Sequence, residues 1–472
     1  MELPPPFDPT VLAHPDPEAI LSGPPAPWDF LSAPAHRDGP PWWMTEMIAA
    51  EPALAGRVLR RFGVVRRSSG VPGVPPKLEA PGRDTPAGRL AAAIRAALQA
   101  GDPVVVTGCG TSEHGAMAFA AIIADAAERA GLRGVEKPGS VLARQAFEAS
   151  LAPQRGGLII GISHEGGTAA TLAALGAAAA RGAKIAAVTV SRAAPIGALG
   201  PLTLETAEID RSWCHTIGYL SPILAGIAVG AALTGESGDA DPIAIRALLA
   251  AGLEQAAHAE RIAAELAGCR EVIVVASGAD LPAGRELALK VEEATWLPTT
   301  LRDTETFLHG HLPAMDGATG LVLILADRAG REARSARAQQ ALAAAARIGM
   351  RPAAILAADL DRAWPAFLAP AGRILVAEAP ALPGPVAAPG AGARDEPGPD
   401  PSRPARLSRG GLAGGLAVDT QPPGAARQPR TSTSPRRSTC SRSQGRKSWS
   451  TSRSQPAASN RATMARASSG VP

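Results

Sequence analysis

Short apolar runs alternate with longer amphipathic stretches from about residue 87 to residue 377. Apolar runs predict strands at residues 104–107, 158–162, 185–190, 202–205, 271–276, 320–325, 353–356 and 373–377. Helical spacing of apolar residues predicts helices at 87–100, 112–130, 168–181, 282–296 and 331–348. Strands that alternate with helices, and that are apolar throughout, are typical of parallel sheets covered on both faces. The chain is therefore predicted to be an α/β protein.

The alternation occurs twice, and the mostly helical stretch 217–269 separates the two passes. We expect two three-layer αβα domains with parallel sheets, at residues 87–240 and 241–385. A helical lead-in and a Pro/Gly-rich linker should occupy residues 41–86, where Thr45 can cap a short helix and residues 53–62 continue it. Residues 1–40 are rich in proline and lack periodicity, which predicts a disordered leader.

No segment of this sequence predicts a membrane span or a secretory signal. The longest apolar helix, residues 217–233, follows a polar turn and is rich in Gly and Ala, which favours a core helix. The start of the chain is Pro-rich and acidic, without the basic and apolar regions of a signal peptide. The four cysteines are scattered without C-x-x-C spacing, so reduced thiols in a cytoplasmic protein are favoured.

The basic residues concentrate at the end of the chain. Residues 389–472 contain 14 Lys and Arg against 4 Asp and Glu, so the rest of the chain has a net charge of −6. A mildly acidic body argues against nucleic acid as a partner of the folded part. Residues 386–472 lack an apolar period and are predicted to be a disordered basic tail. An Arg/Ser mixture can bind RNA, but it also results when GC-rich DNA is read in a shifted frame, and we favour a tail that is out of frame from about residue 387.

Two of the predicted strands run into hydroxyl-rich turns that open helices. Residues 104–107 lead to Gly110, Thr111 and Ser112, and residues 158–162 lead to the loop that ends at Thr168. These hydroxyl groups could simply cap the helices. Because α/β folds bind ligands at the carboxyl ends of their strands, and helix starts hold anions, a sugar-phosphate site is the preferred interpretation.

With these turns placed, four motifs resemble the double sugar isomerase (SIS) family, in particular the isomerase half of glucosamine-fructose-6-phosphate synthase and its deaminase relatives. Cys109-Gly110-Thr111-Ser112 is similar to the first ligand turn of the family, and residues 163–168 to its second. Residues 288–293 are similar to the segment with the isomerase lysine and catalytic glutamate, and His309-Gly310 to the following His-Gly loop. The resemblance covers residues 41–385 and implies a metal-free and cofactor-free reaction in a homodimer.

The resemblance assigns roles to particular residues. Glu293 would be the catalytic base, Lys290 would stabilise developing charge, and His309 would open the sugar ring. By family analogy the His309 loop could serve the site of the neighbouring subunit. The substrate would contact the first turn, the second loop and residue 212; the candidate binding residues are Gly110, Thr111, Ser112, Ser163, His164, Glu165, Thr168 and Ser212.

The alternatives to these assignments are simpler. Lys290 and Glu293 are spaced i, i+3, as in a surface salt bridge. His309 and His311 could chelate a metal, but no third ligand follows at usable spacing. Thr111, Ser112, Ser163 and Thr168 could act only as caps.

Departures from the family pattern restrict the functions that we expect. No glutaminase domain is present, so glutamine-dependent amination is not expected. His164 and Glu165 stand where the family has Gln and Ser for the phosphate, and the C-terminal lysine of the family has no counterpart in the tail. We therefore expect a protein that binds a sugar phosphate or amino-sugar phosphate and isomerises or deaminates it. The alternative is a non-catalytic sensor of such a ligand.

Overall fold

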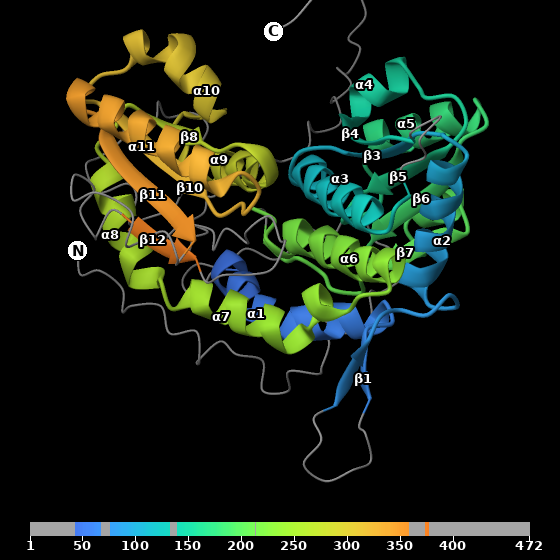
Figure 1. Ribbon diagram of the computed structural model, residues 1–472. Helices are drawn as coiled ribbons and strands as arrows, with labels where there is room; N and C mark the ends of the chain where they lie inside the picture. The colour runs from blue at the N-terminus through green and yellow to red at the C-terminus, as the bar shows by residue number, and fades with distance from the viewer. Residues whose placement is uncertain (1–42, 68–75, 133–138, 213, 358–372, 377–472) are drawn as a thin grey trace, which may run out of the picture. The chain divides into compact units, whose positions relative to one another are not determined.

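The computed structural model of the chain describes residues 43–67, 76–132, 139–212, 214–357 and 373–376 (Figure 1). The predicted leader 1–40 and tail 386–472 lie outside these residues. Within them the chain forms two five-stranded parallel sheets flanked by helices, which confirms the predicted α/β class.

The first sheet has the strand order β4-β3-β5-β6-β7, and all neighbouring strands are parallel. Its strands are β3 (Val104–Gly108), β4 (Val141–Gln145), β5 (Leu158–Ile162), β6 (Lys184–Thr189) and β7 (Leu202–Glu205). The helices around it are α2 (Pro86–Gln99), α3 (Thr111–Arg129), α4 (Ala146–Leu151), α5 (Ala169–Ala179) and α6 (Ile217–Thr234).

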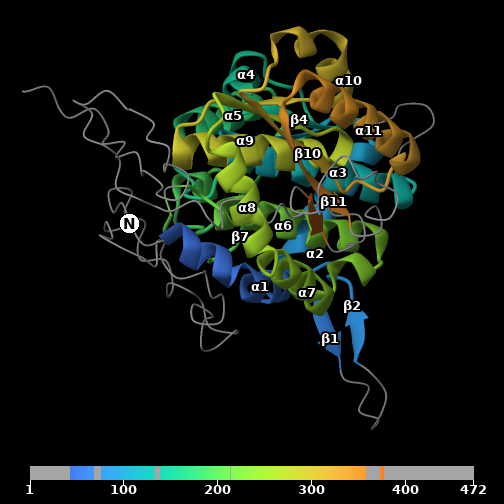
Figure 2. The same ribbon diagram turned by 90° about the vertical axis from the view of Figure 1, so that its left-hand side faces the viewer.

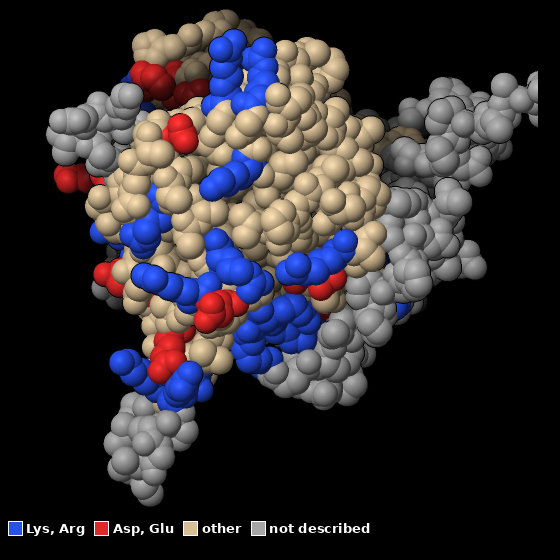
Figure 3. Space-filling view, turned by 90° about the vertical axis from the view of Figure 1, so that its right-hand side faces the viewer, with Lys and Arg blue, Asp and Glu red and all other residues tan. Residues whose placement is uncertain are grey.

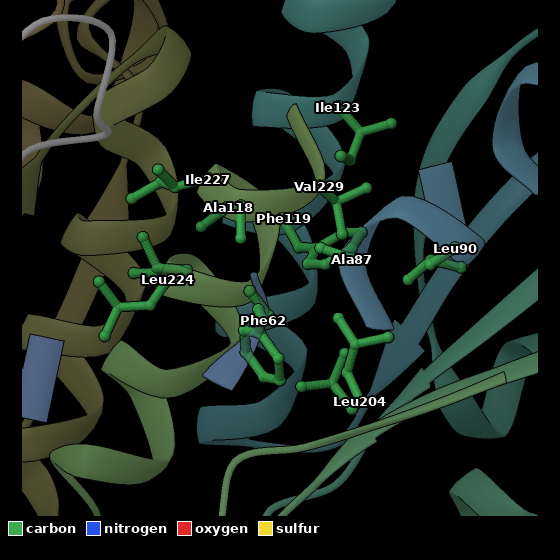
Figure 4. Packing of buried hydrophobic residues seen from close by; sticks show 14 of the residues in the cluster. Phe62, Ala87, Leu90, Ala118, Phe119, Ile123, Leu204, Leu224, Ile227 and Val229 are labelled. Carbon is green, nitrogen blue, oxygen red and sulfur yellow. The ribbon is translucent and has the colours of Figure 1, made fainter. Parts of the chain in front are cut away.

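Successive residues of the central strands pack into different cores because side chains alternate between the two faces of a sheet. Val104 and Val106 pack with α2, α3 and α6, whereas Val105 and Ile159 pack with α5. Figure 4 shows the larger of these two cores, where Phe62 and Phe119 lie among aliphatic side chains from several helices. Both faces are therefore buried, which explains the uninterrupted apolar runs.

The second sheet has the order β12-β11-β10-β8-β9, again with parallel neighbours. Its strands are β8 (Glu271–Val275), β9 (Thr299–Arg302), β10 (Thr319–Leu325), β11 (Arg351–Ala357) and β12 (Arg373–Val376). One face packs on α11 (Arg331–Ile348), and the other packs on α8 (Ala256–Leu266) and α9 (Leu281–Thr295) (Figure 2).

Several elements differ from the sequence expectation. The lead-in is one helix, α1 (Trp43–Arg61), which continues through Pro52, so Thr45 is not its cap. The predicted linker contains a short antiparallel pair, β1 (Val65–Arg67) and β2 (Lys77–Glu79). Strands β4 and β9 were not predicted. Both lie at sheet edges, and the outward-facing residues of β4 remain exposed, so no apolar run marks it.

The remaining helices connect these parts. Helix α7 (Pro242–Leu253) leads from the first half to α8. The short helix α10 (Thr304–Thr306), the turn Phe307–His311 and a 3₁₀ turn at Leu312–Ala314 follow β9. Shorter 3₁₀ turns lie at Pro195–Leu199, Gly238–Ala240 and Gly278–Asp280.

Helix α6 is the one helix in the described ranges that is long and apolar enough to span a membrane. However, 89% of this apolar window is buried inside the protein. It lies beside α3 (Figure 1), where a Cβ atom on Gly115 would come within 2.6 Å of Pro222 Cγ. Helix α6 is therefore a core helix, as its composition predicted.

Candidate functional site

The two hydroxyl-rich turns follow β3 and β5, which are neighbouring parallel strands. Gly110 adopts a positive φ of 55° immediately before α3, so Thr111 occupies the first turn of that helix. In the second loop, the Ser163 hydroxyl accepts a hydrogen bond from the Gly166 N–H at 3.0 Å and lies 3.3 Å from the Thr168 hydroxyl. Thr168 precedes α5 without forming a side-chain cap bond, so within this loop its hydroxyl pairs with that of Ser163.

Lys290 is a buried cation that joins α9 to the first turn. Its Nζ donates to the Thr111 hydroxyl at 2.9 Å and to Glu293 Oε2 at 2.7 Å. A second carboxylate, Glu286, lies 3.2 Å from the same nitrogen. Burial alone would lower the pKa of Lys290, but the charges of Glu286 and Glu293 raise it above its ordinary value. Lys290 is therefore held as an ammonium group.

Glu293 differs from Glu286 in its access to solvent. The Glu293 side chain is 36% exposed and uses Oε2 for its bond to Lys290. Glu286 is buried and accepts from the Thr111 hydroxyl at 3.1 Å. Because a base must reach its substrate, the accessible carboxylate of Glu293 suits proton transfer, whereas Glu286 suits the positioning of Lys290.

Glu286 also contacts His114, a pair that sequence reasoning missed. His114 Nδ1 lies 2.7 Å from Glu286 Oε2, and both side chains are buried. The sequence signal for Glu286 was its spacing from Lys290 and Glu293, which places all three on one face of α9. No sequence signal pairs His114 with Glu286, which lies 172 residues further along the chain.

The segment before α6 is organised by Asp210, another residue that was not predicted. Its Oδ1 accepts from the Ser212 N–H at 3.0 Å and hydroxyl at 2.6 Å. Its Oδ2 accepts from the Thr216 and Gly218 N–H groups, at 2.6 and 3.1 Å. The buried Ser212 hydroxyl is thus occupied by Asp210, although it was expected to face the ligand.

Asp210 remains ionised among these donors. Burial alone would raise its pKa, but the contact with His215, the charge of His215 and the Ser212 hydroxyl hold it well below the ordinary value. Glu51 of α1 lies near this carboxylate, and burial together with the charge of Asp210 raises the pKa of Glu51 to about 8. The site therefore combines one ionised and one protonated carboxyl group at neutral pH.

His164 and Glu165, the two unusual residues of the second loop, have different surroundings. His164 Nε2 accepts a hydrogen bond from the Asp210 N–H at 2.9 Å, so this ring is neutral. Burial, reinforced by the charge of His215, lowers the pKa of His164 to about 3. Glu165 is exposed, and its charge acts on His215.

His309 lies apart from the Lys290 cluster. Its side chain is 68% exposed, and its Nε2 lies 2.7 Å from Glu305 and 3.3 Å from an Arg337 guanidinium nitrogen. The structure therefore brings together Thr111, Lys290 and Glu293, and places Ser163, His164 and Thr168 in the adjacent loop. It leaves His309 on the surface beside α11. Across the described ranges, no three His, Cys, Asp or Glu side chains form a metal-binding group.

Comparison with known proteins supports the fold. No family profile and no curated protein sequence matches the chain. Among solved structures, the C-terminal domain of glucosamine-fructose-6-phosphate aminotransferase from Francisella tularensis is similar with a TM-score of 0.60 and 16% identity, over 75% of this chain and 95% of that one.

Two further structures have the same arrangement. A protein assigned as a phosphosugar isomerase from Clostridium difficile has a TM-score of 0.51 and 18% identity, over 72% of this chain and 88% of that one. A protein from Salmonella typhimurium, assigned as sugar-binding, has a TM-score of 0.51 and 19% identity, over 72% of this chain and 95% of that one. This chain therefore shares its fold with these proteins: two α/β halves, each built on a parallel sheet. The predicted resemblance to the double sugar isomerase (SIS) family is confirmed at the level of the fold.

Proposed function

We propose that the chain binds a sugar phosphate or amino-sugar phosphate and isomerises or deaminates it. The observation that supports this most strongly is the Lys290 cluster, where a buried ammonium group joins the first ligand turn to a solvent-accessible carboxylate. Aldose–ketose conversion moves a proton between adjacent carbons, and it needs both a base and a cation near the oxygen that gains charge. Glu293 and Lys290 supply that pair.

In this mechanism the sugar lies against the two turns. Glu293 takes the proton from C2 of the open-chain aldose and returns it to C1, while the proton of the C2 hydroxyl passes to the C1 oxygen through the enediol. Lys290 stabilises the negative charge on the enediol oxygen, while Glu286 and Thr111 keep its Nζ in place. The paired Ser163 and Thr168 hydroxyls and the start of α5 suit the phosphate. The exposed Glu165 must point away from that phosphate, because a facing carboxylate would oppose binding.

The test begins with a thermal-shift screen against hexose phosphates and amino-sugar phosphates, followed by product analysis with the ligands that bind. Glu293→Gln should abolish turnover and leave ligand affinity within about tenfold, because it removes the base but keeps the shape of the side chain. Glu260→Gln, an exposed change on α8, is the control and should retain full activity. Equal activity in Glu293→Gln and the native protein would remove the enzyme assignment for this site.

The second candidate is a sensor that binds the ligand without converting it. The exposed position of His309, away from Lys290, favours this function, since the group expected to open the sugar ring is not in the site of its own chain. Ligand binding without product, or any exchange of the C2 proton with solvent, would identify the sensor.

We also propose a cytoplasmic homodimer without an organic cofactor. The free thiols of Cys109 and Cys269 are compatible with a reducing compartment. On the face shown in Figure 3, Lys and Arg lie interspersed with Asp and Glu. This mixture does not favour a nucleic-acid partner, because such partners select a continuous basic surface.

A further inference from the structure

His215 has two ring nitrogens in contrasting surroundings. Nδ1 is buried, lies 3.7 Å from Asp210 Oδ2 and has no hydrogen-bond partner among the described residues. The side chain as a whole remains 29% exposed. The exposed edge of the ring is therefore the opposite one, which carries Nε2. One nitrogen faces a fixed carboxylate, and the other is open to a ligand.

The ring is held in this orientation from several sides. Asp210 is fixed by the N–H groups of Ser212, Thr216 and Gly218. The His164 ring lies 5.4 Å from the His215 ring, centroid to centroid. A Cβ atom on Gly218 would come within 3.1 Å of His215 Cβ, so only glycine leaves room for the ring. A carboxylate behind Nδ1 that orients an accessible Nε2 is the arrangement of general acid–base histidines.

Charged groups from the second loop, from the segment before α6 and from the Lys290 cluster act on His215. Burial lowers its pKa, but the contact with Asp210 and the charge of Glu165 outweigh burial, and its pKa is raised overall. Lys290 acts in the opposite direction. His164 is neutral, and Glu51, whose pKa is raised, lies near Asp210. The charges of the second loop and of Lys290 therefore both act on His215, and it carries a proton more readily than a free histidine.

We propose that His215 opens the sugar ring, as a further catalytic residue of the function proposed above. Its Nε2–H donates a proton to the ring oxygen while the bond between that oxygen and C1 breaks, and the electron pair of this bond stays on the oxygen. The exposed carboxylate of Glu165 accepts the proton of the C1 hydroxyl as the carbonyl forms. Ring closure reverses both transfers, so protons and electrons balance.

This assignment gives one chain a complete site. His309 is 68% exposed and is engaged by Glu305 and Arg337, whereas the charges of Glu165 and Lys290 both act on His215. The two histidines can be separated experimentally, because ring opening is measurable without isomerisation. Exchange between the α and β anomers passes through the open-chain sugar, so its rate reports ring opening alone.

The experiment measures anomer exchange of ¹³C-1-labelled glucose 6-phosphate and glucosamine 6-phosphate by NMR exchange spectroscopy, with the full chain. The native protein should accelerate exchange, and His215→Asn should reduce that acceleration by about 100-fold. His258→Asn, a histidine of α8, is the matched control and should behave as native. His215→Gln and a melting curve of each variant show whether a loss reflects misfolding.

Two further measurements separate a catalytic from a structural role. The native exchange rate should fall as the pH rises through the pKa of His215, and this decline should disappear in His215→Asn. Tetrose 4-phosphate cannot close a five- or six-membered ring, so a variant that lacks only ring opening should isomerise it at a rate within about threefold of native. Equal losses on tetrose and hexose phosphates would overturn the proposal.

The outcomes also separate this inference from the proposed function. Anomer exchange that depends on His215 without any isomerisation would support the inference and remove the isomerase. Isomerisation by the native protein, with unchanged anomer exchange in His215→Asn, would support the isomerase and overturn the inference. A native protein that accelerates no anomer exchange would overturn the inference, and a loss confined to His309→Asn would assign ring opening to that residue.

Discussion

At the scale of single residues, the site depends on carboxyl groups kept in different protonation states. Glu51 and Asp210 lie near each other, but Asp210 is surrounded by N–H and hydroxyl donors, whereas burial and the charge of Asp210 favour the protonated form of Glu51. Pairs of titratable groups whose surroundings separate their pKa values are typical of functional sites.

Glu51 predicts a pH dependence of stability. Its pKa is raised from 4.5 in the unfolded chain to about 8 in the fold. Between these values the unfolded state releases a proton that the folded state retains, so the contribution of Glu51 to stability is full below pH 4.5 and is lost as the pH rises to about 8. Glu51→Gln should therefore be more stable than native at pH 9 by roughly 1–3 kcal/mol, and similar at pH 5.

Urea unfolding at pH 5, 7 and 9 measures this difference. Glu260→Gln, on the exposed face of α8, provides a carboxyl-to-amide change without burial and should show no such trend. A Glu51→Gln curve parallel to the native one at all three pH values would contradict the prediction.

At the scale of elements, the contact between α3 and α6 positions both ends of the site. Helix α3 begins at Thr111, and α6 begins beside Asp210 and His215. The two helices approach closely because glycines lie between them: a Cβ atom on Gly115 would meet Pro222 Cγ at 2.6 Å, and one on Gly226 would meet Phe119 at 3.3 Å.

Gly115→Ala should therefore destabilise the protein by about 1–3 kcal/mol, because the added methyl group forces the helices apart. Gly176→Ala is the matched change on α5, where a Cβ atom would meet nothing within 4 Å. It should stabilise by about 0.5–1 kcal/mol through helix propensity. Thermal unfolding compares the two, and equal melting temperatures would refute the close-approach argument.

At the scale of the whole molecule, the Lys290 cluster connects the two halves. Thr111 and His114 belong to α3 of the first half, and Glu286 and Lys290 belong to α9 of the second. A second pair joins the same helices at the surface, where Arg285 lies 3.3 Å from Glu113. Charge pairs therefore join α3 and α9 both in the interior and at the surface. The effect of burial on a charge pair can thus be compared at one helix contact.

Glu286→Gln should lower the free energy of unfolding by about 2 kcal/mol, because Lys290 and His114 lose a buried charged partner. It should also lower kcat, since Glu286 positions Lys290. Glu113→Gln removes the exposed pair and should cost less than about 1 kcal/mol, with kcat unchanged. Urea unfolding and steady-state kinetics measure both effects, and matching losses in the two variants would show that burial is irrelevant here.

The sequence alone predicted most strands and helices of the two sheets, and the structure places them within a few residues of the expected bounds. It failed at β4 and β9 because these two strands contain polar and charged residues and stay partly exposed, so neither shows an apolar run. The sequence did not predict that α1 continues through Pro52, because a proline removes one helical hydrogen bond. The buried contacts of Met47 and Leu54 on either side keep the helix continuous.

For the site, the sequence determined which residue types follow each strand and which share a face of α9, because these relations are local. These relations, together with the family resemblance, predicted Thr111, Lys290 and Glu293, which the structure brings into contact. Only the tertiary structure decided that Glu286 meets His114, and that Asp210 fixes His164 and orients His215, because those contacts join segments far apart in the chain. Local chemistry is set by neighbours in sequence, whereas burial and charge pairing are set by the packing of the helices.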